Sequence, residues 1–174
     1  MKNKRERIVH IYSGEGKGKT TCAVGLAVRA LSYGWKVGFF QFFKVPGKGE
    51  LRLLKKLGAV CRVECRWYPG MQGEVLVEEC GALFSSSWKK VCSSIQKSSF
   101  DLVVLDEILI AVRDGLLSQK ELEEFLLHRP RDTEIVLTGR WDRAFSLRNV
   151  ELMTEMVNIK HPWPGVAARK GIDF

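Results

Sequence analysis

The sequence lacks the features of a secreted, disulfide-bonded or membrane-spanning chain. Its five cysteines are odd in number and include no C-x-x-C pair, so neither a disulfide framework nor a zinc site is indicated. No apolar run approaches the length of a membrane span, and the amino terminus has no apolar signal segment. We therefore expect residues 1–174 to form a single domain in the cytoplasm, without a membrane partner.

The sequence also has little that suggests nucleophilic, acid–base or metal chemistry by histidine. The histidines His10, His128 and His161 are far apart and show no metal-ligand spacing. No serine or cysteine lies in a nucleophile-elbow pattern. No catalytic nucleophile or general base is therefore evident from these patterns.

The positive charge of the chain is not concentrated in one segment. The net charge is +8, from 28 basic and 20 acidic residues, but there is no long basic run and no aromatic–basic repeat. Such a charge is compatible with nucleic acid and with an anionic small molecule. The scattered distribution favours the small anionic ligand over nucleic acid.

What the sequence does contain is a glycine-rich stretch between a predicted strand and a predicted helix. Residues 13–21 read Ser-Gly-Glu-Gly-Lys-Gly-Lys-Thr-Thr, after an apolar run at 8–12 and before a helical pattern over 20–32. This is the context that a phosphate-binding loop requires. Backbone N–H groups would seat phosphate oxygens, Lys19 would add a charge, and the Thr20 hydroxyl would bind Mg²⁺. A nucleoside triphosphate is the expected ligand of the loop, through Ser13, Gly14, Glu15, Gly16, Lys17, Gly18, Lys19, Thr20 and Thr21.

The loop departs from the usual G-x-x-x-x-G-K-[ST] pattern at its first position. That position holds Ser13, and the glycines stand at Gly14, Gly16 and Gly18. A glycine-rich turn that binds nothing is the alternative interpretation. The departure suggests that the phosphates lie differently from those in an ordinary nucleotidase.

Two further polar groups follow predicted strands. Asp106 and Glu107 come directly after an apolar run, where carboxylates hold Mg²⁺ or its water shell together with Thr20. An aspartate that only caps the next helix is the alternative. Arg140 follows the apolar segment 134–138, and its position suits phosphate binding and a structural salt bridge equally well.

Alternating strand and helix patterns predict an α/β fold with a mostly parallel sheet and helices on both faces. Helices are expected over 20–32, 50–57, 74–97 with an interruption near Gly81, and 118–127. Strands are expected over 8–12, 36–43, 59–65, 101–107, 134–138 and 152–159. The irregular segment 66–73 carries Trp67, Tyr68 and Met71, which either fold back on the core or line a pocket.

Taken together, these residues resemble one family, the ATP:corrinoid adenosyltransferases of the CobA/BtuR/CobO type, also known as cob(I)yrinic acid a,c-diamide adenosyltransferases. The resemblance covers nearly the whole chain. It includes the loop at 13–21 with its non-glycine first position, and segments 36–44, 49–50, 105–107, 137–140, 154–156, 160–162 and 171–173.

The resemblance implies a RecA-like P-loop fold, a homodimer, and a reaction that moves the 5′-deoxyadenosyl group of ATP to cobalt(I). The corrinoid would be cobalamin, cobinamide or cobyrinic acid a,c-diamide, and triphosphate would leave. ATP would lie in a reversed sense along the loop, with Mg²⁺ at Thr20, Asp106 and Glu107. Because cobalt(I) is itself the nucleophile, no catalytic side chain is expected. An electron donor of the flavoprotein type is a further implied partner.

The sequence departs from the family pattern in two places. Few residues precede the first strand, so the site would either be openly accessible or be closed by other segments. The family has a Gly-Phe-Thr-Trp-like sequence where this chain has Arg-Trp-Tyr-Pro-Gly-Met at 66–71. We expect corrinoid contacts from Trp67, Tyr68 and Met71. A RecA-like ATPase acting on nucleic acid and a nucleotide-binding switch without chemistry are the competing functions.

Overall fold

The described strands of the chain form one parallel sheet. The computed structural model describes residues 7–44, 49–65, 77–141, 147–160 and 165–172. Within them a six-stranded sheet has the order β3-β2-β4-β5-β1-β6, and every neighbouring pair is parallel. The strands are β1 (Val9–Ser13), β2 (Val37–Phe42), β3 (Val60–Glu64), β4 (Leu102–Asp106), β5 (Glu134–Thr138) and β6 (Leu152–Glu155).

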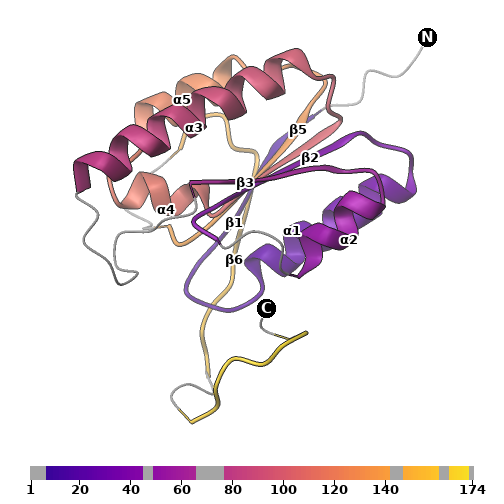
Figure 1. Cartoon of the computed structure of the whole chain (residues 1–174), viewed down its shortest axis with the longest axis vertical. Helices are drawn as coiled ribbons and strands as arrows, with labels where there is room; N and C mark the ends of the chain where they lie inside the picture. Colours follow the sequence, from indigo (N-terminus) through magenta and orange to yellow (C-terminus); the bar gives the residue numbers. More distant parts are fainter. Residues whose placement is uncertain (1–6, 45–48, 66–76, 142–146, 161–164, 173–174) are drawn as a thin grey trace.

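Helices cover both faces of this sheet (Figure 1). The helices α1 (Lys19–Ser32) and α2 (Glu50–Lys56) lie on one face. The other face is covered by α3 (Val77–Lys97), α4 (Ile108–Arg113) and α5 (Gln119–Leu127). Each face has its own apolar core. Strands buried on both sides are therefore mostly apolar, as in β2, where all six residues are buried and Gln41 is the one polar residue.

Most predicted elements are confirmed by the structure. The helix after the glycine-rich loop ends as predicted, with Gly34 in a left-handed conformation (φ 75°) beyond its last residue. The capping box of α5 is also present. The Ser118 hydroxyl accepts from the Glu121 N–H at 3.2 Å, and the Glu121 carboxylate accepts from the Ser118 N–H at 3.0 Å.

Three details of the predicted secondary structure were wrong. Helix α3 continues through Gly81 without interruption, because buried Phe84 and Trp88 on its inner face outweigh the cost of one glycine, about 1 kcal/mol. Strand β6 ends at Glu155 instead of Ile159, because the Met156 carbonyl turns toward the glycine-rich loop. The short helix α4 was not predicted at all.

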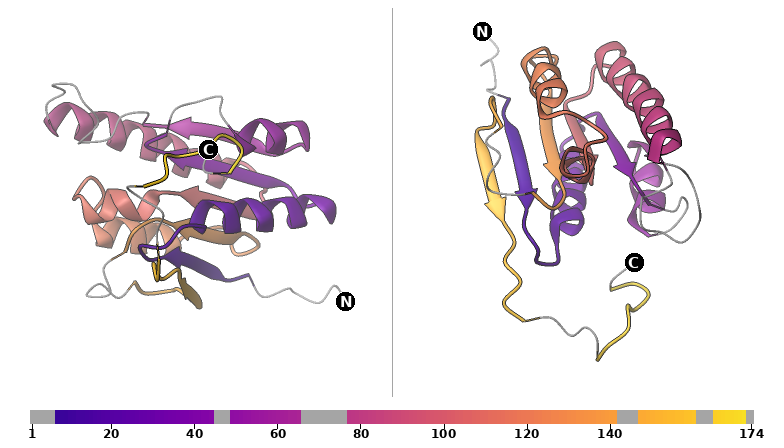
Figure 2. Two further views of the ribbon diagram at one scale, coloured as in Figure 1. Left: turned by 90° about the horizontal axis from the view of Figure 1, so that it is seen from below. Right: turned by 90° about the vertical axis from the view of Figure 1, so that its left-hand side faces the viewer.

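The sheet topology gathers the predicted polar groups at one edge. In a parallel sheet all strands point the same way. The last residues of four strands therefore lie at the same carboxyl end of the sheet: Ser13, Phe42, Asp106 and Thr138. After β6 the chain projects beyond this edge, as the yellow segment in Figures 1 and 2 shows. Among the residues that the structure describes, no helix has both the length and the apolar character needed to cross a membrane.

Candidate active site

The glycine-rich loop joins the end of β1 to the start of α1. Gly18 precedes the helix in a left-handed conformation (φ 117°), which glycine adopts without a steric penalty. No side chain caps this helix terminus. The N-cap glycine offers no side-chain oxygen to the first N–H groups of α1, and a helix terminus of this kind is suited to binding anions.

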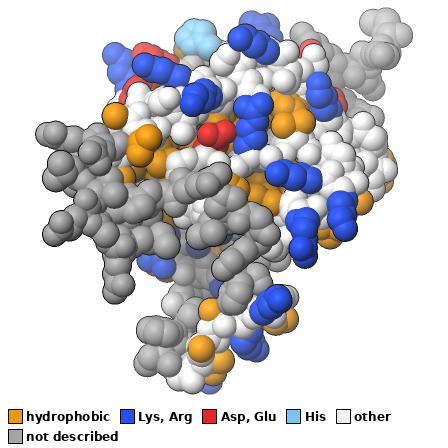
Figure 3. Space-filling model, viewed as in Figure 1, with side chains coloured by type: hydrophobic (Ala, Val, Ile, Leu, Met, Phe, Trp, Pro, Cys, Tyr) orange, Lys and Arg blue, Asp and Glu red, His pale blue; other side chains and the backbone are white. Residues whose placement is uncertain are grey.

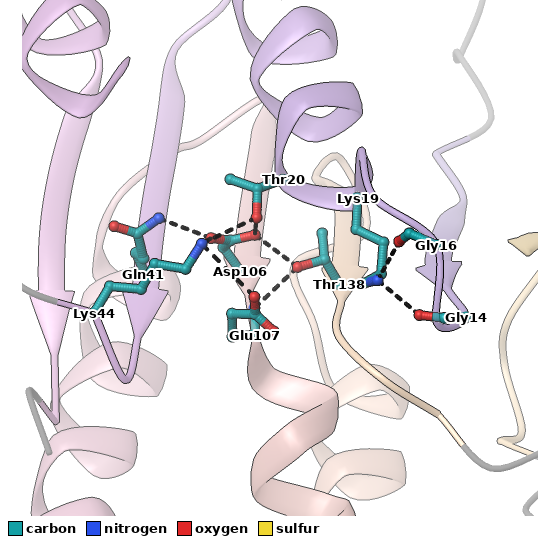
Figure 4. Close-up of polar contacts among 9 residues, drawn as sticks. All are labelled: Gly14, Gly16, Lys19, Thr20, Gln41, Lys44, Asp106, Glu107 and Thr138. Atoms are coloured by element: carbon teal, nitrogen blue, oxygen red, sulfur yellow. Dashed lines mark hydrogen bonds and ion pairs between the residues drawn. The ribbon is translucent and has the colours of Figure 1, made fainter. Parts of the chain in front are cut away.

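The Lys19 side chain folds back over the loop. Its ammonium donates to the carbonyl oxygens of Gly14 at 2.6 Å and Gly16 at 2.7 Å (Figure 4). Burial lowers the pKa of Lys19, and nearby Glu107 opposes that shift. A partly buried cation held at the mouth of the loop would gain from an added anionic ligand. Phosphate binding by Lys19 stays a prediction.

Two loop glycines are required for a reason that sequence analysis did not identify. The Gly16 N–H donates to the Met156 carbonyl at 2.6 Å, and the Met156 N–H donates to the Ser13 carbonyl at 2.8 Å. A Cβ atom at Gly14 would collide with the Met156 carbonyl oxygen, and one at Gly16 would lie 2.6 Å from it. Gly14 and Gly16 thus permit close approach of the chain after β6, which occupies one loop N–H group.

Asp106 is the centre of a buried hydrogen-bond network. It is 0% exposed and ends strand β4. Its Oδ1 accepts from Thr20 Oγ1 at 2.9 Å and from Thr138 Oγ1 at 2.6 Å, and its Oδ2 accepts from Gln41 Nε2 at 2.8 Å (Figure 4). Asp106 does not cap the following helix, whose N-cap is Glu107. The network connects β2, β4 and β5 to the first turn of α1.

Glu107 lies beside Asp106 in a strained backbone conformation. Its φ is 66°, a left-handed value that is uncommon for a residue with a Cβ atom. Its N–H donates to Thr138 Oγ1 at 2.9 Å. Burial raises the pKa of Glu107, the Asp106 carboxylate raises it further, and Lys44 and Lys19 oppose the shift. Two carboxylates are thus held side by side, which favours a cation between or near them.

The raised pKa of Glu107 predicts how stability depends on pH in metal-free and nucleotide-free buffer. A raised carboxyl pKa means that the folded state favours the protonated form, so this stability is present at low pH and is lost as pH rises through the folded pKa. We expect Glu107→Gln, which is permanently neutral, to unfold at higher urea concentration than the wild type above that pKa. The difference should disappear at lower pH. A wild type that gains on the variant as pH rises would contradict the assignment.

The oxygen atoms of Thr20, Asp106 and Glu107 fit a magnesium ion. Mg²⁺ usually takes one or two carboxylates, keeps several waters and completes its shell with substrate phosphates. Among the described residues, no group of three or more His, Cys, Asp or Glu side chains could hold a metal. A hydroxyl with two carboxylates at the phosphate loop is thus suited to a metal that arrives with a nucleotide.

The other predicted site residues lie at various distances from this centre. Arg140 Nη1 pairs with Glu15 Oε2 at 3.2 Å, so the arginine lies beside the loop in a salt bridge. Lys17 Nζ donates to the Ile172 carbonyl at 3.1 Å, and Thr21 is exposed on the first turn of α1. The predicted corrinoid contacts Trp67, Tyr68 and Met71 lie outside the described residues.

Three polar residues at the site were not predicted: Gln41, Lys44 and Thr138. Gln41 is a buried amide inside the apolar strand β2, and a polar residue in such a run is the signal that could have identified it. Thr138 is fully buried at the end of β5. The Lys44 ammonium lies 3.6 Å from Glu107 Oε1.

The order of the strands, the loop between β1 and α1, and the acidic end of β4 define the chain as a RecA-like P-loop α/β protein. A family model described as ATP:corrinoid adenosyltransferase BtuR/CobO/CobP matches residues 5–174. The chain therefore belongs to this family of transferases, which move the adenosyl group of ATP to the cobalt of corrinoids. The resemblance predicted from the sequence is confirmed.

Individual relatives agree with the family match. The chain is 33% identical over 170 residues to the corrinoid adenosyltransferase of Escherichia coli, covering 96% of this chain and 85% of that protein. Identity to the corrinoid adenosyltransferase CobA of Salmonella typhimurium is 32% over 170 residues, with the same coverage. Identity to the corrinoid adenosyltransferase of Pseudomonas aeruginosa is 30% over 175 residues, covering 96% and 83%.

Proposed function

We propose that residues 13–21 bind the triphosphate of ATP so that C5′, and not a phosphorus atom, faces the cobalt of a bound corrinoid. The observation that carries this proposal is the Asp106 network. Through this network Thr20 of the loop is bonded to Asp106 at the end of β4. Lys19 lies at the same carboxyl end of the sheet. Arg140 lies beside the loop and supplies a further positive charge.

The proposed reaction is a displacement at carbon. Cobalt(I) gives its electron pair to C5′ as the cobalt–carbon bond forms, and the C5′–O bond breaks with its pair going to triphosphate. The carbon centre neither gains nor loses a proton, so the protein needs to position C5′ and stabilise the leaving charge. Lys19 and the N–H groups at the start of α1 are placed to stabilise the charge of the leaving triphosphate.

Thr20, Asp106 and Glu107 would hold Mg²⁺ when it is bound. The chemistry that Mg²⁺ supplies is neutralisation of charge on the leaving triphosphate. The use of the Gly16 N–H by the Met156 carbonyl leaves the loop with fewer groups for a phosphate. That loss supports a polyphosphate that lies along the loop in a reversed sense.

The proposal is tested by incubating the protein with ATP, Mg²⁺ and chemically reduced cobalamin. We expect a light-sensitive cobalt–carbon product, and its absence would contradict the proposal. Phosphate release stimulated by single-stranded DNA would instead favour a nucleic-acid ATPase. On the face drawn in Figure 3, Lys and Arg side chains are scattered over the surface and do not form a continuous stripe, which supports a small anionic ligand.

We also propose that the chain works as a homodimer. Strand β6 is an edge strand, and Met153 on it is 53% exposed. In the segment after β6, Ile159 is 93% exposed and Val157 is 64% exposed. An edge strand continued by exposed apolar side chains is suited to burial against a second copy. Sedimentation equilibrium would give twice the chain mass if this proposal is right.

Three further parts of the proposal concern the protein as a whole. We propose that residues 1–174 form one domain, supported by the single sheet. A cytoplasmic location is supported by the five cysteines, which all lie within the described residues and form no disulfide bond there. A flavoprotein-type electron donor would reduce the corrinoid cobalt to cobalt(I), which the proposed displacement requires.

A further inference from the structure

Lys44 reaches the candidate metal site from a fixed turn at the end of β2. The preceding residue, Phe43, has a left-handed φ of 57°. Its N–H donates to the Cys65 carbonyl at 3.0 Å, and its ring stacks on Phe84 with centroids 5.9 Å apart. A strained conformation held by a hydrogen bond and a packed ring directs the next side chain in a defined way. Figure 4 shows that this side chain points toward Asp106 and Glu107.

The Lys44 ammonium lies among the three groups assigned to the metal. Its Nζ is 3.3 Å from Thr20 Oγ1, 3.6 Å from Glu107 Oε1 and 3.8 Å from Asp106 Oδ2. The single hydroxyl proton of Thr20 is donated to Asp106. Thr20 Oγ1 therefore presents only lone pairs to Lys44, and these are the electrons that a metal ion would need.

We propose that Lys44 is a resident cation of the metal site, which neutralises Asp106 and Glu107 and must leave before a divalent ion can bind. This inference rests on the magnesium site of the proposed function. An ammonium and a divalent ion would compete for the same Thr20 oxygen and would repel each other at this distance. The Lys44 side chain is 38% exposed on a flexible stem, so it can move out toward solvent.

This arrangement would make metal binding depend on the nucleotide. A free divalent ion must displace Lys44 without giving it a new partner. A divalent ion that arrives with ATP brings phosphate oxygens, which can accept the displaced ammonium. Lys44 would thus keep the site closed to free metal and would become a contact to the polyphosphate once the nucleotide is bound.

The test measures binding of Mn²⁺, used in place of Mg²⁺, to the nucleotide-free protein. Binding is monitored as a decrease in the electron paramagnetic resonance signal of unbound Mn²⁺. Removing a positive charge within 4 Å of the site in Lys44→Met should tighten Mn²⁺ binding by about tenfold or more. Lys44→Gln should do the same, and it serves if the first variant folds poorly. Lys44→Arg keeps the charge and should bind Mn²⁺ as weakly as the wild type.

The matched control is Lys36→Met, which removes the same charge just before β2, at the opposite end of that strand. Its Mn²⁺ affinity should equal that of the wild type. Unchanged affinity in Lys44→Met and Lys44→Gln, with Mn²⁺ still binding to the ATP-loaded wild type, would overturn the role of Lys44 and leave the metal site intact. Failure of the ATP-loaded wild type to bind Mn²⁺ would overturn the metal site itself. Neither readout depends on corrinoid turnover.

Discussion

Lys19→Ala is expected to lower the rate of adenosylcobalamin formation by about a hundredfold to a thousandfold at saturating ATP. The structure holds the Lys19 ammonium against the carbonyl oxygens of Gly14 and Gly16. Its charge would be placed where negative charge develops on the leaving triphosphate. The rate is measured with chemically reduced cobalamin, so that cobalt reduction does not limit it.

A surface lysine provides the control for this prediction. Lys120 is exposed near the start of α5, and Lys120→Ala removes the same charge on the face of the sheet opposite α1. Its rate should match that of the wild type, and both variants should have wild-type circular dichroism. Turnover by Lys19→Ala near the wild-type rate would show that the loop is not the phosphate seat.

Asp106→Ala is expected to destabilise the protein and to abolish the dependence of adenosyl transfer on Mg²⁺. The change leaves the buried donors of Gln41, Thr20 and Thr138 without their common acceptor. Losing a buried charged acceptor costs about 3–5 kcal/mol. For a chain of this size, that loss corresponds to a fall of Tm by roughly 6–20 °C. Differential scanning calorimetry without nucleotide measures the effect.

Thr138→Val calibrates the Asp106 result. It removes one donor to Asp106 and the acceptor of the Glu107 N–H, while nearly keeping the shape of the side chain. We expect a smaller loss of about 1–3 kcal/mol. If Asp106→Ala melts at the wild-type temperature, or if Thr138→Val costs more than Asp106→Ala, the network does not hold this edge of the sheet together.

Much of the fold could be predicted because its central strands are buried on both faces. Nearly continuous apolar runs such as 37–43 and 102–105 have few alternatives to a central parallel strand. Helix α4 could not be predicted, because it has only six residues and begins directly after the acidic pair. The continuity of α3 through Gly81 depends on tertiary packing of its inner face, which local propensity does not report.

The glycine-rich loop and the acidic pair, Asp106 and Glu107, could be predicted because each consists of residues that are adjacent in the sequence. The partners of Asp106 could not, because they come from other strands. Gln41 meets Asp106 only because β2 and β4 pair in that register. The close approach of Met156 to Gly14 and Gly16 likewise depends on β6 lying beside β1. Spatial neighbours that are distant in sequence leave no local pattern to read.

The central claim is that the protein breaks the bond between C5′ and the triphosphate, and not a bond between phosphates. Phosphorus NMR of the products formed from ATP and reduced cobalamin tests it most directly. We predict that intact triphosphate appears in step with the cobalt–carbon product. Diphosphate or phosphate as the first product, with the adenosyl group still attached to a phosphate, would contradict the claim.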